Sequence, residues 1–284
     1  MSHRACTLCG ADRPRLLYVC DEDFVSRLVF EGHRQAYSIV RCRRCGLVYV
    51  GEEVSDALLS ELYSAGYYQG RDGSGFHDYS AEEAKYRPRF AGRIARMRGH
   101  VEEGRADLRV LDVGCALGWF VSEAVRAGWA AEGVDKSEYC RAFAAEKLGV
   151  TVHAGGLEDV AIPDGGYDLV TLWDTIEHLP DPRGMLATVR DYVAPGGWVA
   201  LTTGNHDSVR ARLKGQDWAL VRPPKHLFYF TPRTLTSLVE QAGFAVIDVW
   251  PELPGKIPGP VREVLGRASL DTADIFGVLA VRTD

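Results

Sequence analysis

Residues able to carry out acid–base chemistry gather behind one apolar run, in LWDTIEHLPDP at Leu172–Pro182. This stretch offers two carboxylates, Asp174 and Glu177, and the imidazole of His178. Histidine is the usual proton acceptor near neutral pH, so His178 is a candidate general base. A structural role, in which the side chain only hydrogen-bonds the loop, is the alternative.

A second histidine, His226, competes for the same role in the segment RPPKHLFYF. Its neighbours Arg222 and Lys225 would hold an anionic group on a bound molecule, and aromatic residues surround all three. Because these neighbours could hold a bound molecule, we expect His226 to be the better candidate for the base. A structural histidine is again the alternative.

Four cysteines have the spacing of a metal site. Cys6 and Cys9 lie in CTLCG, and Cys42 and Cys45 lie in CRRCG. Each CxxC pair supplies two thiolates from one tight turn, and four thiolates hold Zn²⁺ tetrahedrally with no open position. The pattern predicts a structural zinc ribbon, and we expect this segment to unfold when the ion is removed. The alternative is that the cysteines have a redox role.

Bulk properties limit the class of protein. The chain has 284 residues, 46% hydrophobic residues and a net charge of −6. Its apolar runs are shorter than the roughly 20 residues of a membrane span, and its N-terminus lacks an apolar signal segment. These features favour a cytoplasmic protein without membrane contact. The acidic balance argues against a protein that mainly grips nucleic acid, although the Arg-rich first 50 residues leave a small basic patch open.

The elements that position these residues are strands and helices in alternation. From residue 108 short apolar strands alternate with amphipathic helices, and Thr231 and Pro232 begin one such helix. This alternation predicts a doubly wound parallel α/β sheet with helices on both faces. Such sheets bind ligands outside the carboxyl ends of their strands. Residues 51–103 read as helical, and Pro88 indicates a kink or a new start within them.

The strand exits carry the polar and small residues of a ligand site. Asp112, Gly114 and Gly118 follow one strand in VLDVGCALGWF, a pattern that differs from the dinucleotide fingerprint. A carboxylate at this place suits a ligand with an ammonium or sulfonium group. Asp135 follows the next strand, where an acid accepts hydrogen bonds from ribose hydroxyls, and Glu158 follows the third. A structural glycine turn and a helix N-cap are the alternatives.

The chain resembles a class I methyltransferase that uses S-adenosylmethionine (SAM). The resemblance rests on the motifs above together with GYDLVTLWDTIEHLPDP, LATVRDYVAPGGWVALTT and PPKHLFYFTPRTLTSLVEQAGF. The resemblance covers residues about 80 to 284. It implies a Rossmann-like sheet of seven strands with the last strand antiparallel. Together with the cysteine pairs, the chain also resembles zinc-bearing methyltransferases of bacterial sugar and natural-product pathways. The expected division is a zinc ribbon (1–50), a helical linker or lid (51–103) and a SAM-binding domain (104–284).

The resemblance assigns residues to parts of the cofactor. Asp112, Gly114 and Gly118 would line the methionine part, and Ala116 stands where the family usually has Gly. We expect that alanine to be tolerated at negative φ. Arg89 would bind the SAM carboxylate, with an exposed arginine as the alternative. The whole cofactor set comprises Asp112, Gly114, Cys115, Gly118, Asp135, Lys136, Leu157, Glu158, Trp173, Asp174, Arg89 and Tyr68.

Tyr67 and Tyr68 would form part of a lid, and aromatic packing between helices is the alternative.

The expected reaction is O-methylation of a sugar or natural product by an in-line displacement, with C- or N-methylation of a small molecule also open. An RNA methyltransferase that clamps RNA with its ribbon is a second class, and a non-catalytic SAM-fold module is a third. The sequence defines neither the acceptor nor the oligomeric state, and the Pro/Gly-rich residues 251–270 name no ligand.

Overall fold

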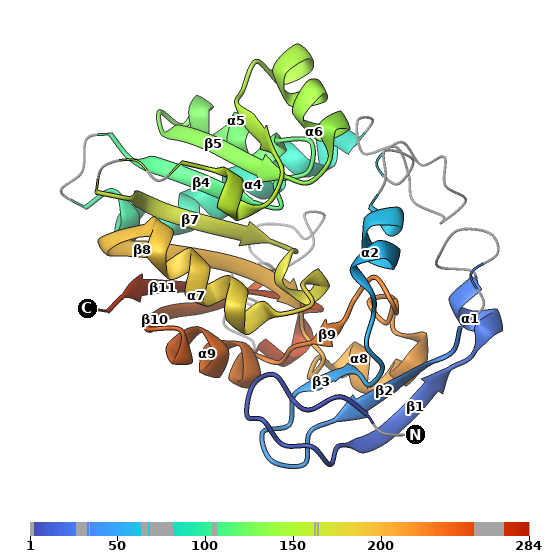
Figure 1. Cartoon of the computed structure of the whole chain (residues 1–284). Helices are drawn as coiled ribbons and strands as arrows, with labels where there is room; N and C mark the ends of the chain where they lie inside the picture. Colours follow the sequence, from blue (N-terminus) through green and yellow to red (C-terminus); the bar gives the residue numbers. More distant parts are fainter. Residues whose placement is uncertain are drawn as a thin grey trace.

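The computed structural model describes residues 3–26, 33, 35–63, 68, 82–103, 107–161, 163, 165–252 and 270–283. Two sheets organise them, a large one at the centre and a small one formed around the N-terminal segment (Figure 1). Among the described helices, none combines the length and apolar character that crossing a membrane requires.

Seven strands form the large sheet, and their order is β10-β11-β8-β7-β4-β5-β6. They are β4 (Arg109–Val113), β5 (Ala130–Asp135), β6 (Val152–Ala154), β7 (Tyr167–Trp173), β8 (Val193–Gly204), β10 (Phe244–Glu252) and β11 (Ile275–Arg282). The strands β6, β5, β4, β7 and β8 pair in parallel, whereas β11 runs antiparallel to both β8 and β10. The predicted Rossmann-like sheet with an antiparallel last strand is confirmed.

Helices cover both faces of this sheet. The described helices are α1 (Glu22–Ser26), α2 (Asp56–Leu62), α4 (Glu83–Val101), α5 (Trp119–Arg126), α6 (Glu138–Phe143), α7 (Pro182–Tyr192), α8 (Val209–Lys214) and α9 (Pro232–Gln241). One apolar cluster joins α4 and α5 to the sheet, and another joins α7 and α9 to it (Figure 1). The predicted helix start is confirmed, since Thr231 caps α9 by accepting a hydrogen bond from the amide of Thr234. Pro88 starts no new helix, because α4 continues through it.

Four antiparallel strands form the small sheet, in the order β1-β2-β3-β9. Three come from the N-terminal segment: β1 (Arg15–Cys20), β2 (Tyr37–Arg41) and β3 (Val48–Val50). The fourth is β9 (Phe228–Tyr229), which pairs Tyr229 with Val48 and Phe228 with Tyr49. A strand just after His226 therefore completes the sheet of the cysteine-bearing segment, and the two regions share one apolar cluster. The division at residue 50 stays a prediction.

Candidate active site

The glycine loop after β4 lies directly against the exit of β7. Gly114 and Gly118 have φ values of 70° and 81°, in the left-handed region that favours glycine. A Cβ on Gly114 would come within 2.6 Å of Cγ2 of Thr175. A side chain at Gly114 fits neither this backbone nor this space, so glycine is required there for the loop to approach the exit of β7. At Gly118 the left-handed backbone alone favours glycine.

Ala116 departs from the expectation. Its φ is 48°, so the prediction that this alanine sits at negative φ is wrong. In this left-handed conformation the amide of Ala116 donates a hydrogen bond of 2.9 Å to Oδ2 of Asp135. This bond ties the glycine loop to the end of β5.

Asp135 hydrogen-bonds the glycine loop, the start of the next helix and Tyr68. Its Oδ1 accepts hydrogen bonds from the amide of Ser137 at 2.9 Å and from the hydroxyl of Tyr68 at 3.3 Å. Burial raises the pKa of Asp135, although its hydrogen-bond donors oppose that shift. Tyr68 is buried and Asp135 is only 8% exposed, so the structure brings both to one place beside the glycine loop. The other predicted lid residue, Tyr67, lies outside the described residues.

Asp112 points into the sheet next to the loop. The hydroxyl of Thr171, on the neighbouring strand β7, donates a hydrogen bond of 2.6 Å to its Oδ1. Burial raises the pKa of Asp112 to about 8. Cys115 is buried, and its Sγ lies close behind the backbone of Gly133 on β5. Its thiol therefore packs into the protein interior.

The predicted cofactor residues that follow β5 and β6 differ in exposure. Leu157 is buried, and its carbonyl accepts a hydrogen bond of 2.7 Å from the hydroxyl of Tyr192. The side chains of Glu158 and Lys136 are exposed at the ends of two strands. Trp173 is buried at the end of β7, with the guanidinium carbon of Arg93 4.7 Å from its ring centre.

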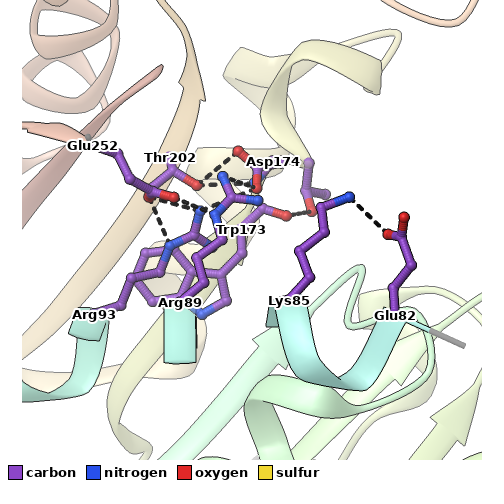
Figure 2. A network of polar contacts seen from close by, with 9 residues as sticks. Glu82, Lys85, Arg89, Arg93, Trp173, Asp174, Thr202 and Glu252 are labelled. Carbon is purple, nitrogen blue, oxygen red and sulfur yellow. Dashed lines mark hydrogen bonds and ion pairs between the residues drawn. The ribbon is translucent and has the colours of Figure 1, made fainter. Parts of the chain in front are cut away.

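Asp174 lies in a network of four charged groups (Figure 2). Its Oδ2 is 3.1 Å from Nη2 of Arg89 and 3.1 Å from Nη2 of Arg93, and its Oδ1 accepts from the hydroxyl of Thr202. Glu252 of β10 pairs with both arginines. Burial alone would raise the pKa of Asp174, but the two guanidinium groups outweigh burial and hold it below its usual range. Arg89 is thus a member of an ion network and no exposed surface residue.

His178 and His226 meet edge to face. Their ring centres are 4.7 Å apart, with planes at 85°. Nδ1 of His178 hydrogen-bonds the carbonyl of Lys225 at 2.8 Å and lies 2.6 Å from the hydroxyl of Tyr63, while Nδ1 of His226 bonds the carbonyl of Leu220 at 2.8 Å. Burial lowers the pKa of His178, and it lowers that of His226 well below the usual value. Both imidazoles are therefore neutral near pH 7.

The groups around these histidines differ in exposure. Lys225 is 1% exposed, whereas Arg222 is half-buried and donates a hydrogen bond of 2.7 Å to the carbonyl of Ala219. Glu177 is 5% exposed, and burial raises its pKa to about 8. Its carbonyl accepts from the amide of Leu227, which fixes the β7 exit to the segment that carries His226.

The four cysteines of the CxxC pairs lie together. Sγ of Cys6 is 3.5 Å from Sγ of Cys45, and Sγ of Cys9 is 3.4 Å from Sγ of Cys42. All four are free thiols whose sulfur atoms lie within 4.8 Å of one another. Four ligands at about 2.3 Å from one Zn²⁺ lie roughly 3.8 Å apart, so the cluster fits a tetrahedral site. Cys20 lies outside this cluster and is fully buried.

Sequence reasoning missed several residues of the site. Thr171 and Tyr63 contact Asp112 and His178 from distant segments, and nothing in their local sequence marks them. Arg93 follows Arg89 by one helical turn, so a shared helix face could have indicated it.

Comparisons with known proteins find methyltransferases. A family model described as a methyltransferase domain matches residues 81–249. A ubiquinone biosynthesis O-methyltransferase of Thiobacillus denitrificans is 29% identical over 191 residues, which is 63% of this chain and 80% of that protein. One from Bordetella avium is 34% identical over 147 residues, covering 48% of this chain and 61% of that protein.

Solved structures share the fold. A SAM-dependent methyltransferase of Thermotoga maritima, described as a possible histamine N-methyltransferase, aligns with a TM-score of 0.53 at 18% identity, over 72% of this chain and 95% of that one. Magnesium protoporphyrin IX methyltransferase of Synechocystis, solved with bound S-adenosylhomocysteine (SAH), aligns with a TM-score of 0.53 at 16% identity, over 77% of this chain and 94% of that one.

Proposed function

Because the chain belongs to the methyltransferase-domain family and is a SAM-dependent methyltransferase, we propose that it methylates a hydroxyl oxygen of a small-molecule acceptor. The observation that carries the proposal is the contact between two neutral imidazoles, His178 at the exit of β7 and His226 in the segment before β9. The names of the O-methyltransferase relatives support a hydroxyl acceptor. A sugar or a natural product is the acceptor class that we propose.

The glycine loop and the ends of β4, β5 and β7 would hold SAM. In this arrangement Asp135 accepts hydrogen bonds from the ribose, supported by its position against the amide of Ala116. Asp112 and the loop glycines would face the methionine part, and Trp173 and Asp174 would close over it. Arg89 would reach the cofactor carboxylate only by giving up part of its contact with Asp174 or Glu252. Leu157 and Glu158 would flank the adenine.

The chemistry is an in-line displacement at carbon. The acceptor oxygen forms a bond to the methyl carbon, the C–S bond breaks, and its electron pair stays on sulfur. The protein must hold oxygen and carbon about 3 to 3.5 Å apart and in line. The acceptor hydroxyl must also lose its proton, and we propose that the histidine pair activates it. In the direct form predicted from the sequence, His226 accepts that proton.

We also propose that Cys6, Cys9, Cys42 and Cys45 bind a structural Zn²⁺. The sulfur spacing supports a closed tetrahedral site. Because β9 pairs with β3, an ion in this cluster would stabilise the strand that directly follows His226.

Calorimetry with SAM tests the central proposal. The wild type should bind SAM, and Asp135→Ala should weaken binding by about ten-fold or more, since the variant loses the proposed ribose contact. Asp191→Asn, at an exposed carboxylate far along the chain from the loop, serves as the control. Mass spectrometry across candidate hydroxyl acceptors should then detect addition of one methyl group. Absence of SAM binding to folded, zinc-loaded wild type would contradict the proposal.

One feature favours RNA as a second candidate acceptor. Arg15, Arg41, Arg43, Arg44 and Arg233 line an open cleft of about 400 Å³ beside the cysteine cluster. Within the described part of the chain, no carboxylate forms an ion pair with these five guanidinium groups. RNA binding there would weaken steeply with salt, so titration of a single-stranded RNA at two salt concentrations separates this candidate from the small-molecule one.

A further inference from the structure

A second cluster of metal-ligating side chains lies beside the proposed SAM pocket. Glu177, His178 and His226 each offer one ligand atom, and these atoms lie within 4.8 Å of one another. Three ligands held at roughly 2.1 Å from one ion are at most about 3.6 Å from one another, so closing of about 1.2 Å brings the three into one coordination sphere. The carboxyl of Glu177 is buried, and in the described part of the chain its Oε2 has no hydrogen-bond partner. A buried acceptor left in this way is costly unless something binds it.

The two imidazoles are oriented as metal ligands usually are. Each Nδ1 hydrogen-bonds a backbone carbonyl, that of Lys225 for His178 and that of Leu220 for His226. A carbonyl only accepts, so each Nδ1 carries the proton and each Nε2 keeps its lone pair. Backbone carbonyls that fix the tautomer in this way are the common outer-sphere partners of metal-bound histidine.

The space beside these ligands suits a small occupant. Glu177 and His226 both line a small, partly open cavity of about 10 Å³, together with Thr203, Trp218 and Tyr229. This volume is close to that needed for one water molecule. It is sufficient for an ion or one of its water ligands.

We infer that Glu177, His178 and His226 bind a divalent transition-metal ion. A set of two imidazoles and one carboxylate suits Mn²⁺, Fe²⁺ or Zn²⁺ and leaves coordination positions open. This inference rests on the proposed function and deepens it. The ion would bind the acceptor hydroxyl and lower its pKa, the proton would leave to water, and the oxygen would attack the methyl carbon while the C–S electron pair passes to sulfur. In this form the two histidines act as ligands and neither takes the proton, so the ion replaces the direct form in which His226 accepts it.

The test is a Mn²⁺ titration of the full chain with its cysteine cluster loaded with zinc, followed by EPR and by calorimetry. The wild type should bind one Mn²⁺ per chain. His226→Gln, His178→Gln and Glu177→Gln should each weaken binding by more than about ten-fold, because each removes one of three protein ligands. His100→Ala, at an exposed histidine outside the cluster, should bind Mn²⁺ as the wild type does. The use of three separate variants keeps the test valid if one of them fails to fold.

Two results would overturn the inference: a zinc-loaded wild type that takes up no Mn²⁺, or glutamine variants that bind Mn²⁺ as tightly as the wild type. SAM binding, measured on the same samples, separates this failure from failure of the proposed function. If SAM binds without any Mn²⁺ site, the proposed function stands and only the metal site is wrong. If SAM does not bind at all, the proposed function fails whatever the result with Mn²⁺.

Discussion

Arg93 lies 3.1 Å from Asp174 although 81 positions separate them in the chain. The side chain of Arg93 is 2% exposed, and it joins helix α4 to the exit of β7 and, through Glu252, to the end of β10 (Figure 2). Asp174 has a φ of 51°, which is unusual for a residue other than glycine. The ion pair therefore holds a strained turn at the edge of the site.

Removal of this arginine should destabilise the fold strongly. Arg93→Ala removes the more buried of the two arginines that pair with Asp174 and Glu252 and leaves only Arg89, so we expect a loss of up to about 3 to 5 kcal/mol in the free energy of unfolding. Urea denaturation measures this loss. Arg96→Ala is the matched control, because Arg96 lies on the same helix and pairs with Asp248 at the surface. An exposed pair contributes about 1 kcal/mol or less, so equal losses in the two variants would contradict the role of Arg93.

Asp112 should make stability depend on pH. Its pKa is raised from 3.8 to about 8 in the folded chain, so between these values the folded state holds a proton that the unfolded chain has released. Stability from this group is fully present below about pH 4 and is lost as pH rises through about 8, with a slope of at most about 1.4 kcal/mol per pH unit.

Asp112→Asn cannot ionise, so it should lose less stability than the wild type between pH 6 and pH 9. Denaturant unfolding without cofactor at several pH values in this range measures the difference. Asp191→Asn, at an exposed site, should follow the wild type. If the Asp112→Asn curve ran parallel to the wild-type curve, the folded-state pKa of Asp112 would not be raised.

Loss of zinc should reach beyond the N-terminal segment. Cys42→Ser removes one of four thiolates, and the variant should retain less than the one Zn²⁺ per chain that we expect for the wild type. Because β3 pairs with β9, amide exchange should quicken at Phe228 and Tyr229 as well as in β2 and β3. Metal analysis and hydrogen exchange measure both effects. Cys20→Ala should keep its zinc, and unchanged protection of β9 in zinc-free protein would show that the two regions are independent.

Replacement of the paired histidines should affect turnover more than cofactor binding. We expect His226→Gln to lower kcat by about 10²- to 10⁴-fold with SAM affinity nearly unchanged, since the imidazole acts on the acceptor hydroxyl. His178→Gln should show a similar loss, because the two rings are in contact. Steady-state kinetics with calorimetry for SAM provide the comparison, and His153→Gln at a distant strand is the control. Wild-type turnover in both variants would remove the pair from the mechanism.

Sequence patterns predicted those parts of the structure that depend on interactions between residues close together in the chain. The strand–helix alternation gave the parallel sheet, the cap at Thr231 gave the start of α9, and the CxxC pairs gave a compact thiol cluster. Contacts between distant segments carry no such signal. The two residues of β9 are too few to show alternation, so their pairing with β3 was not predicted. The contact of Tyr63 with His178 and that of Arg93 with Asp174 likewise depend on how the helices dock.

Ala116 provides a test of backbone strain in the cofactor loop. Its φ of 48° costs an alanine roughly 1 to 2 kcal/mol, whereas glycine adopts this conformation without that penalty. Glycine also gains entropy in the unfolded chain, which offsets about 0.4 to 1 kcal/mol of the relief. We therefore expect Ala116→Gly to raise the free energy of unfolding by up to about 1.5 kcal/mol. Ala127→Gly is the control: Ala127 has a φ of −77°, so glycine there relieves no strain and should destabilise. Urea denaturation of both variants measures the change in the free energy of unfolding. If Ala116→Gly lost as much stability as Ala127→Gly, the loop would be unstrained at Ala116.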